Sequence, residues 1–259
     1  MIYAVVTAGG IPKPDEPLYE HTRGSNKAML DVAGKPMIQW VLDALSGAKT
    51  IDGVLVMGLG PETGLSCSKP IQFTPNQASM LENILAGIRR VLEIEPNAHH
   101  ILLVSSDIPA ITPEMVDWVV NAALETDDDV YYNVIPREIM DARYPGSRRS
   151  FTRLKDIEVC GGDMNVVRTL LATGKDELWD RIISARKNIF KQASLLGYDV
   201  LIQLLFRAIT LKEAEKKASK RLGLKGHVIV CPYAEVGMDV DKPHQLEMMR
   251  KDMEGRRPA

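Results

Sequence analysis

The sequence predicts a three-layer α/β/α fold, in which a mostly parallel mixed β-sheet lies between two layers of helices. Apolar runs at residues 2–7, 54–60 and 101–109 are each followed by a helical pattern. Short runs that are apolar throughout are typical of parallel strands buried on both faces. The repeated order of strand and helix therefore indicates parallel crossovers, with helices on both faces of one sheet.

The helices between these runs carry recognisable start signals. We expect Pro36 as the first residue of the first long helix, because proline is favoured there. Ser79 and Glu82 have the spacing of a capping box at the start of the second helix. Thr112 and Pro113 supply a cap and a first-turn proline for the third.

The second half of the chain follows a different pattern. After an apolar run at 129–135, the segment from about 166 to 222 has a helical pattern throughout, with a second capping box at Thr210 and Glu213. The chain then returns to a strand at HVIVCPY and closes with an amphipathic helix. We predict one domain over residues 1–259, with a helical insertion at about 166–222.

Composition limits the partners and the compartment. The 259 residues carry a formal net charge of -2, which argues against a surface that binds nucleic acid. Cys67, Cys160 and Cys231 lack the CxxC spacing of a zinc site, and no run is long enough to span a membrane. We expect a cytoplasmic protein with reduced thiols, no nucleic acid partner and no membrane partner.

Candidate ligand-binding residues follow the predicted strands, because ligands of parallel sheets bind beyond the carboxyl ends of the strands. Gly9 and Gly10 follow the first strand and would let backbone amides approach phosphate oxygens, although a plain tight turn is an equal alternative. Arg23 and Lys27 come next and could neutralise triphosphate charge. Neither GxGxxG nor GxxxxGK[ST] occurs, which argues against a dinucleotide-binding fold and a P-loop ATPase.

Acidic residues at two other strand ends indicate a metal site. Asp107 follows the third strand, where its carboxylate would suit Mg²⁺, which combines one or two carboxylates with phosphate oxygens and waters. Near the C-terminus, Asp239 and Asp241 flank Val240, and one of them could complete the site. Asp241 could instead cap the last helix before Pro243, which would leave Asp239 as the freer ligand.

Three motifs together resemble those of the MobA-like nucleotidyltransferases, a branch of the GT-A-type NTP transferase superfamily with a Rossmann-like fold. They are the AGG turn followed by NKAMLDVAGKPMIQWVLDAL, the metal-aspartate motif SSDIPAITPEMV and the terminal motif DVDKPHQLEMM. A fourth element, VCGGDMNVV, is similar to the GGN element that contacts the acceptor in relatives. The resemblance covers residues 1 to about 125 and 225–250.

The resemblance implies a role for each matched residue. It implies that the nucleotide is held by Ala8, Gly9 and Gly10 with Ser79 near the base, its phosphates by Lys27, the Mg²⁺ by Asp107, and the acceptor by Gly162 and Asp163. The loop IPKPDEPLYEHTRGSN is longer than in relatives, so either Lys13 or Arg23 would replace their loop arginine. Asp163 stands where relatives often have asparagine, and its carboxylate would repel an anionic acceptor or bond a hydroxylated one.

The activity implied is Mg²⁺-dependent transfer of NMP from an NTP to a phosphorylated small molecule, with release of pyrophosphate. Arg148, Arg149 and Arg153 could bind an anionic acceptor or be solvated surface charge. Two alternatives remain at this stage. One is a GT-A-like glycosyltransferase that uses a nucleotide sugar, and the other is a non-catalytic nucleotide-binding regulatory protein. A homodimer is possible in any of these cases.

Overall fold

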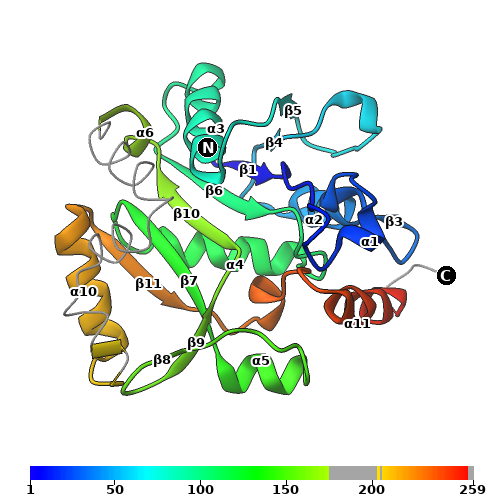
Figure 1. Ribbon diagram of the computed structural model, residues 1–259. Coiled ribbons are helices and arrows are strands. Elements are labelled where there is room, and N and C mark those ends of the chain that lie inside the picture. Colours follow the sequence, from blue (N-terminus) through cyan, green and yellow to red (C-terminus); the bar gives the residue numbers. More distant parts are fainter. Residues whose placement is uncertain (175–202, 205, 256–259) are drawn as a thin grey trace.

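The computed structural model describes residues 1–174, 203, 204 and 206–255. Within these ranges, nine strands form one mixed sheet in the order β5-β4-β1-β6-β10-β7-β9-β8, with β11 paired to β7 (Figure 1). The strands are β1 (Tyr3–Thr7), β4 (Gly53–Met57), β5 (Ile71–Thr74), β6 (His100–Ser105), β7 (Val130–Pro136), β8 (Thr152–Arg153), β9 (Glu158–Gly161), β10 (Met164–Arg168) and β11 (Gly226–Val230). The hairpin β2 (Asp31–Val32) and β3 (Lys35–Pro36) lies apart.

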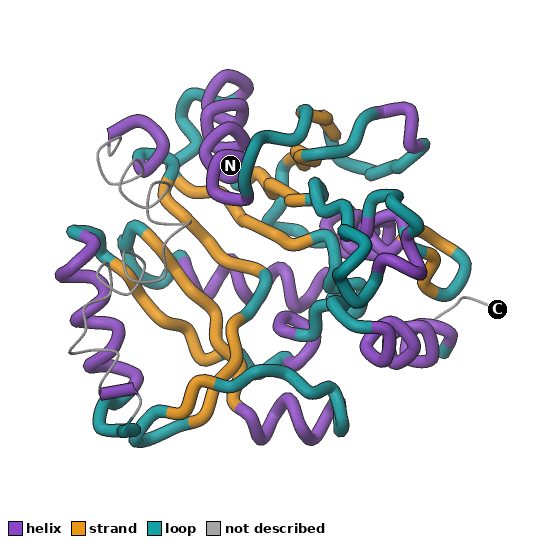
Figure 2. The backbone as a smooth tube through the Cα atoms, in the orientation of Figure 1, coloured by secondary structure: helices purple, strands orange, loops and turns teal. Residues whose placement is uncertain are grey.

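Helices cover both faces of this sheet (Figure 2). The described helices are α1 (Tyr19–Thr22), α2 (Met37–Gly47), α3 (Met80–Ile94), α4 (Pro113–Ala123), α5 (Arg137–Arg143), α6 (Leu171–Gly174), α10 (Leu211–Leu222) and α11 (Pro243–Glu254), with short 3-10 turns at Lys27–Met29, Pro61–Thr63 and Ala234–Gly237. Strands β1, β4, β5 and β6 are mutually parallel. The predicted α/β class with a mostly parallel mixed sheet is confirmed.

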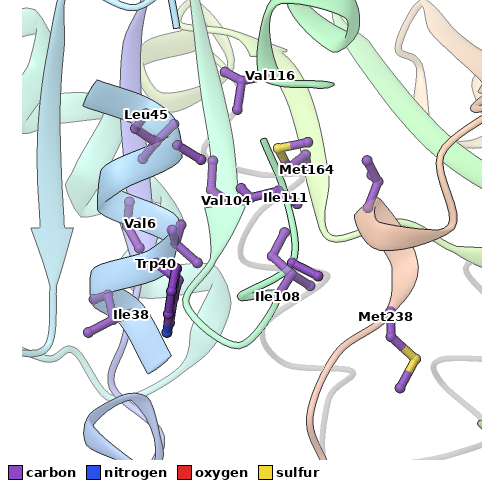
Figure 3. Close-up of a cluster of buried hydrophobic side chains, with 14 of the residues drawn as sticks. Val6, Ile38, Trp40, Leu45, Val104, Ile108, Ile111, Val116, Met164 and Met238 are labelled. Atoms are coloured by element: carbon purple, nitrogen blue, oxygen red, sulfur yellow. The ribbon is translucent and has the colours of Figure 1, made fainter. Parts of the chain in front are cut away.

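The apolar first strand is explained by burial on both of its faces. Ala4 and Val6 belong to the core cluster that includes α2 and α4, whereas Val5 packs in a second cluster with α3. Successive side chains of a strand point to opposite faces, so a strand between two helical layers has no polar side. Figure 3 shows Val6 and Val104 in the larger cluster together with Ile38, Trp40 and Leu45 of α2.

The predicted helical section begins too early. Residues 166–168 belong to β10, which runs antiparallel between β6 and β7 and is part of the main sheet. Met164 and Val166 pack in one core cluster and Val167 packs in the other, so the side chains alternate between the two faces of the sheet. In a short run that is apolar throughout, the sequence does not show this alternation. Most of the rest of the predicted insertion, residues 175–202, lies outside the described residues.

The predicted helix starts are largely correct. Ser79, Thr112 and Thr210 are the N-caps of α3, α4 and α10, and the capping box of Thr210 and Glu213 is complete. Pro36 is the N-cap of α2 instead of its first residue, because its ψ of 138° continues strand β3. α10 packs against β11 and therefore covers the sheet. No described helix has the length and apolar character needed to cross a membrane.

Gly58 permits the close approach of the ends of β1 and β4. It has a φ of +100°, and a Cβ there would lie 2.6 Å from the Cα of Gly9. Gly58→Ala should therefore destabilise the fold by about 1–3 kcal/mol more than Gly24→Ala, because Gly24 also has a positive φ of +83° but has open space around it. Urea unfolding of the two variants measures this difference. Equal losses would show that backbone strain alone sets the cost.

Candidate functional site

A cavity of about 330 Å³ lies at the carboxyl ends of β1 and β6, where ligands of such sheets bind. Its walls come from four segments that are far apart in the sequence. They are Thr7, Gly9, Gly10, Lys27, Asn76, Gln77, Ala78, Ser79, Met80, Asn83, Ser105, Ser106 and Asp107. Five residues expected at the site, Gly9, Gly10, Lys27, Ser79 and Asp107, are therefore brought together around one cavity.

In the glycine turn, Ala8 is fixed by hydrogen bonds, whereas Gly10 is open. Ala8 is buried, its N–H donates to Met57 O at 2.8 Å, and its carbonyl accepts a bond from Asn26 Nδ2 at 2.5 Å. Both of its backbone groups are therefore engaged, so Ala8 supports the turn without offering an amide to a ligand. Gly10 has open space where a Cβ would stand, which leaves room for a ligand close to the backbone.

Two amide side chains, those of Asn76 and Asn83, fix the wall next to the glycine turn. Asn83 of α3 is buried, donates to Asn76 Oδ1 at 2.8 Å and accepts from the Gln77 N–H at 2.8 Å. Asn76 lies so close to Gly9 that a Cβ on Gly9 would meet its Oδ1 at 2.0 Å. Ser79 caps α3 at the end of this wall and accepts a bond from the Glu82 N–H at 3.2 Å.

The Lys27 ammonium lies between two carboxylates at the edge of the cavity. Its Nζ is 2.5 Å from Asp107 Oδ2 and 2.6 Å from Asp241 Oδ1. Burial lowers the pKa of Lys27, but the charges and hydrogen bonds of the two carboxylates outweigh it, so its pKa is raised. The other oxygen of Asp107 accepts a hydrogen bond from the Ser105 hydroxyl at 2.5 Å, which fixes the carboxylate orientation.

This carboxylate pair has the composition of a divalent metal site. One oxygen of Asp107 and one of Asp241 touch the same nitrogen, so both are within reach of a single small cation. Mg²⁺ is typically bound by one or two carboxylates together with phosphate oxygens and waters. Among the described residues, no group of three or more potential ligands gathers at one point, so a metal here would need ligands from the substrate.

The two C-terminal aspartates have different roles from those expected. Asp241 does not cap α11, because Lys242 is the N-cap and the Asp241 side chain bonds to Lys27. Asp239 forms an ion pair with Arg149, and both side chains are largely buried. Asp241 is therefore beside Asp107, whereas Asp239 is committed to an arginine.

The predicted acceptor element lies next to this carboxylate pair. Gly162 packs tightly against β7, and the Asp163 carbonyl accepts the Ser105 N–H at 2.9 Å, which joins the element to the end of β6. The Asp163 carboxylate is 3.9 Å from Arg149. Burial, followed by the charge of Asp107, raises the pKa of Asp163 to about 7.

A second cavity, of about 530 Å³, continues from Gly10 and Lys27 beneath the long loop, where Glu16, Pro17, Leu18, Asp241 and Lys242 also line it. Arg23 is exposed and lines neither this cavity nor the first, and the same holds for Lys13. Lys242, which lines the second cavity, makes no ion pair with the residues described. Besides Lys27, the cation that lines this cavity is therefore Lys242 of the C-terminal motif.

Several residues of the site were not identified from the sequence. Asn26, Ser105, Asn76 and Asn83 hold the walls of the cavity through side-chain hydrogen bonds. Asn26 and Ser105 could have been found from their positions in the sequence. Asn26 directly precedes Lys27, and Ser105 stands two residues before Asp107. Asn76 and Asn83 had no such signal, because their role depends on how α3 packs against β1.

The cavity, with its glycine turn and carboxylate pair, lies at the carboxyl ends of the strands, where α/β enzymes bind their ligands. A model of the MobA-like NTP transferase domain matches residues 4–196. The chain belongs to this family and is a nucleotidyltransferase. Membership favours the nucleotidyltransferase over the two alternatives, the glycosyltransferase and the non-catalytic regulatory protein.

Two similar proteins support this assignment, and a third shares the fold. The chain is 26% identical over 248 residues to 3-deoxy-manno-octulosonate cytidylyltransferase of Geotalea uraniireducens, covering 90% of this chain and 96% of the relative. A hypothetical transferase from Thermus thermophilus has a TM-score of 0.82 and 31% identity, with 95% and 99% of the two chains covered. CMP:2-keto-3-deoxy-manno-octonic acid synthetase in complex with CTP shares the fold, with a TM-score of 0.59, 16% identity and 99% coverage of each chain.

The raised pKa of Asp163 predicts a pH-dependent stability. The folded state keeps the Asp163 proton up to about pH 7, whereas the unfolded chain loses it near the ordinary pKa of 3.8, so stability falls as the pH rises between these values. Asp163→Asn should remove this loss and gain about 2 kcal/mol relative to the wild type between pH 5 and pH 8. Denaturant unfolding without metal measures it. Asp15→Asn, at an exposed site, is the control, and a pH-independent effect of Asp163→Asn would contradict the prediction.

Proposed function

We propose that the chain transfers NMP from an NTP to a phosphorylated small molecule in a Mg²⁺-dependent reaction that releases pyrophosphate. The observation that carries this proposal is the position of Lys27. Its ammonium joins Asp107 and Asp241 at the point where the two cavities meet, directly beside Gly9 and Gly10. A triphosphate that follows the glycine turn from one cavity into the other would pass this group.

The first cavity suits the nucleoside part of the NTP. Ser79, Gln77 and Asn83 bring polar groups to its wall, and the turn at Gly9 and Gly10 would lie along the sugar and α-phosphate. The second cavity would receive the leaving pyrophosphate, with Lys27 and Lys242 as its cations. Lys242 would thus bind the phosphates that an arginine of the loop binds in relatives.

Asp107 and Asp241 would hold the Mg²⁺, with Ser105 keeping the Asp107 carboxylate oriented. A bound Mg²⁺ supplies charge neutralisation to the phosphate oxygens and leaves little covalent work to the protein. Lys27 would stabilise the charge that develops on the pyrophosphate as the bond to the α-phosphorus breaks. Loss of one such stabilising group typically costs on the order of 10²–10³ in rate.

The acceptor would approach from the side of Gly162 and Asp163, because Asp163 lies near Asp107 and neither residue lines the first cavity. An acceptor phosphate oxygen would attack the α-phosphorus and take the NMP. CTP is the first NTP to examine, because the Geotalea uraniireducens relative is named as a cytidylyltransferase.

The experiment that tests this function measures pyrophosphate release with Mg²⁺ across the four common NTPs. Each is combined with a panel of sugar phosphates and polyol phosphates, and 3-deoxy-manno-octulosonate is included as an acceptor without phosphate. Release that needs a phosphorylated acceptor supports the proposal. Release with 3-deoxy-manno-octulosonate alone would overturn the acceptor class, and no release with any pair would overturn the proposal.

Substitutions should separate the role of the metal-binding residue Asp107 from that of the candidate phosphate-binding residues Lys242 and Arg23. Asp107→Asn should lower kcat by at least about 100-fold, because it removes a group that neutralises charge in the transition state. Lys242→Gln should lower kcat about 10-fold, and Arg23→Gln should stay within about twofold of the wild type, because Arg23 lines neither cavity. Steady-state kinetics decide this. A larger loss of kcat in Arg23→Gln than in Lys242→Gln would indicate that the loop residue Arg23, and not Lys242, binds the phosphates.

The same assay identifies the second metal ligand. Asp241→Asn should raise the Mg²⁺ concentration for half-maximal rate by about 10-fold or more, because Asp241 lies beside Asp107. Asp239→Asn should leave this concentration nearly unchanged, because Asp239 is paired with Arg149. Titration of the rate with Mg²⁺ measures both values. The opposite ranking would make Asp239 the ligand.

A further inference from the structure

A third cavity, of about 340 Å³, lies beside the acceptor element and is lined by four arginines. It contains Arg137, Arg148, Arg149 and Arg153 together with Asp141 and Phe151. Its volume falls at the lower end of the range of small-ligand sites, about 300–1,000 Å³. None of the nucleotide, metal or pyrophosphate positions proposed above uses this cavity.

The charges around this cavity leave one arginine without a partner. Arg137 pairs with Asp141 and Glu158, and Arg153 also pairs with Glu158. Arg149 pairs with Asp239 outside the cavity. Arg148 is exposed and has no ion pair with any described residue, so its guanidinium is free to bind an oxyanion. Four carboxylates, those of Asp141, Glu158, Asp239 and Asp163, lie near these arginines, and among the described residues none of the four pairs with Arg148.

Arg149 connects this cavity to the reaction centre. Its guanidinium lies between the cavity and the carboxylates of Asp239 and Asp163, and the Asp163 backbone is bonded to the strand that carries Asp107. The Nε of Arg149 is buried and has no hydrogen-bond partner in the described structure. This buried nitrogen is not exposed to the cavity, so an anion there would bind the part of the Arg149 guanidinium that lines it.

The remaining wall suits the body of a small polyol or sugar. The ring of Phe151 lies against Arg137, with 5.1 Å from the guanidinium carbon to the ring centroid, and offers an apolar face next to the charged groups. Planar guanidinium groups bind phosphate and carboxylate oxygens through paired hydrogen bonds. The cavity therefore combines recognition of an anionic group with space for the rest of a small molecule.

We propose that the cavity around Arg148 and Arg149 binds the acceptor through an anionic group, a phosphate monoester or a carboxylate, separate from the oxygen that attacks the nucleotide. This inference rests on the proposed function, because it assigns the acceptor side of the same site. It makes Arg148 a determinant of acceptor specificity. It gives Arg149 a positioning role, because Arg149 links the bound anion to Asp163 and Asp239.

The experiment measures binding without turnover, with glucose 6-phosphate and gluconate as probes of the two anionic groups. Calorimetric titrations compare the wild type with Arg148→Gln and Arg148→Lys, with a non-hydrolysable CTP analogue occupying the nucleotide site. We expect Arg148→Gln to weaken binding of at least one probe by about 10–100-fold, the range for losing a charged hydrogen bond, and Arg148→Lys to weaken it less. The probe affected identifies the anionic group.

Arg207→Gln is the matched control, because Arg207 is also an exposed arginine with a positive φ, 50° against 54° for Arg148, and does not line the cavity. Affinity for the CTP analogue should be unchanged in all variants, which verifies that they are folded. Probe affinities that are equal in the wild type and Arg148→Gln, or no binding of either probe to the wild type, would overturn the inference. Arg148-dependent binding without pyrophosphate release would contradict only the proposed function.

Discussion

The Lys27 ammonium, held between Asp107 and Asp241, is the interaction on which the architecture of the site depends. It joins the end of the long N-terminal loop, the carboxyl end of β6 and the segment before α11, which are far apart in the sequence. Two carboxylates this close repel each other unless a cation separates them, and the partial burial strengthens both effects. The same three groups, Lys27, Asp107 and Asp241, therefore hold the three segments together and balance the charge of the site.

The change from parallel to antiparallel pairing explains why the acceptor element lies beside Asp107. β10 runs antiparallel to β6, with Met164 opposite Val104, so β10 begins at the edge where β6 ends. The turn that carries Gly162 and Asp163 therefore lies at the carboxyl edge of the sheet. A further parallel strand would enter from the opposite edge and would place its preceding loop far from the site.

The residues predicted correctly are those whose signal is local. The buried strand β1, the caps Ser79 and Thr112, and Asp107 directly after β6 follow from periodicity, capping preference and strand ends. For residues 166–168 of β10 the sequence predicts a helix, because so short a run cannot separate a period of two from one of 3.6. The partners of Asp239 and Asp241 also could not be predicted, because they depend on where Arg149 and Lys27 arrive from other parts of the chain.

The charge balance at the centre favours a divalent ion that arrives with the nucleotide. Asp107, Asp163, Asp239 and Asp241 contribute four carboxylates, against the two cations Lys27 and Arg149. A bare triphosphate would meet this surplus negative charge and compete for Lys27, whereas a Mg²⁺ complex brings two positive charges to the same oxygens. Burial, and after it the charge of Asp107, raises the pKa of Asp163, and a proton on that carboxyl removes one of the excess charges.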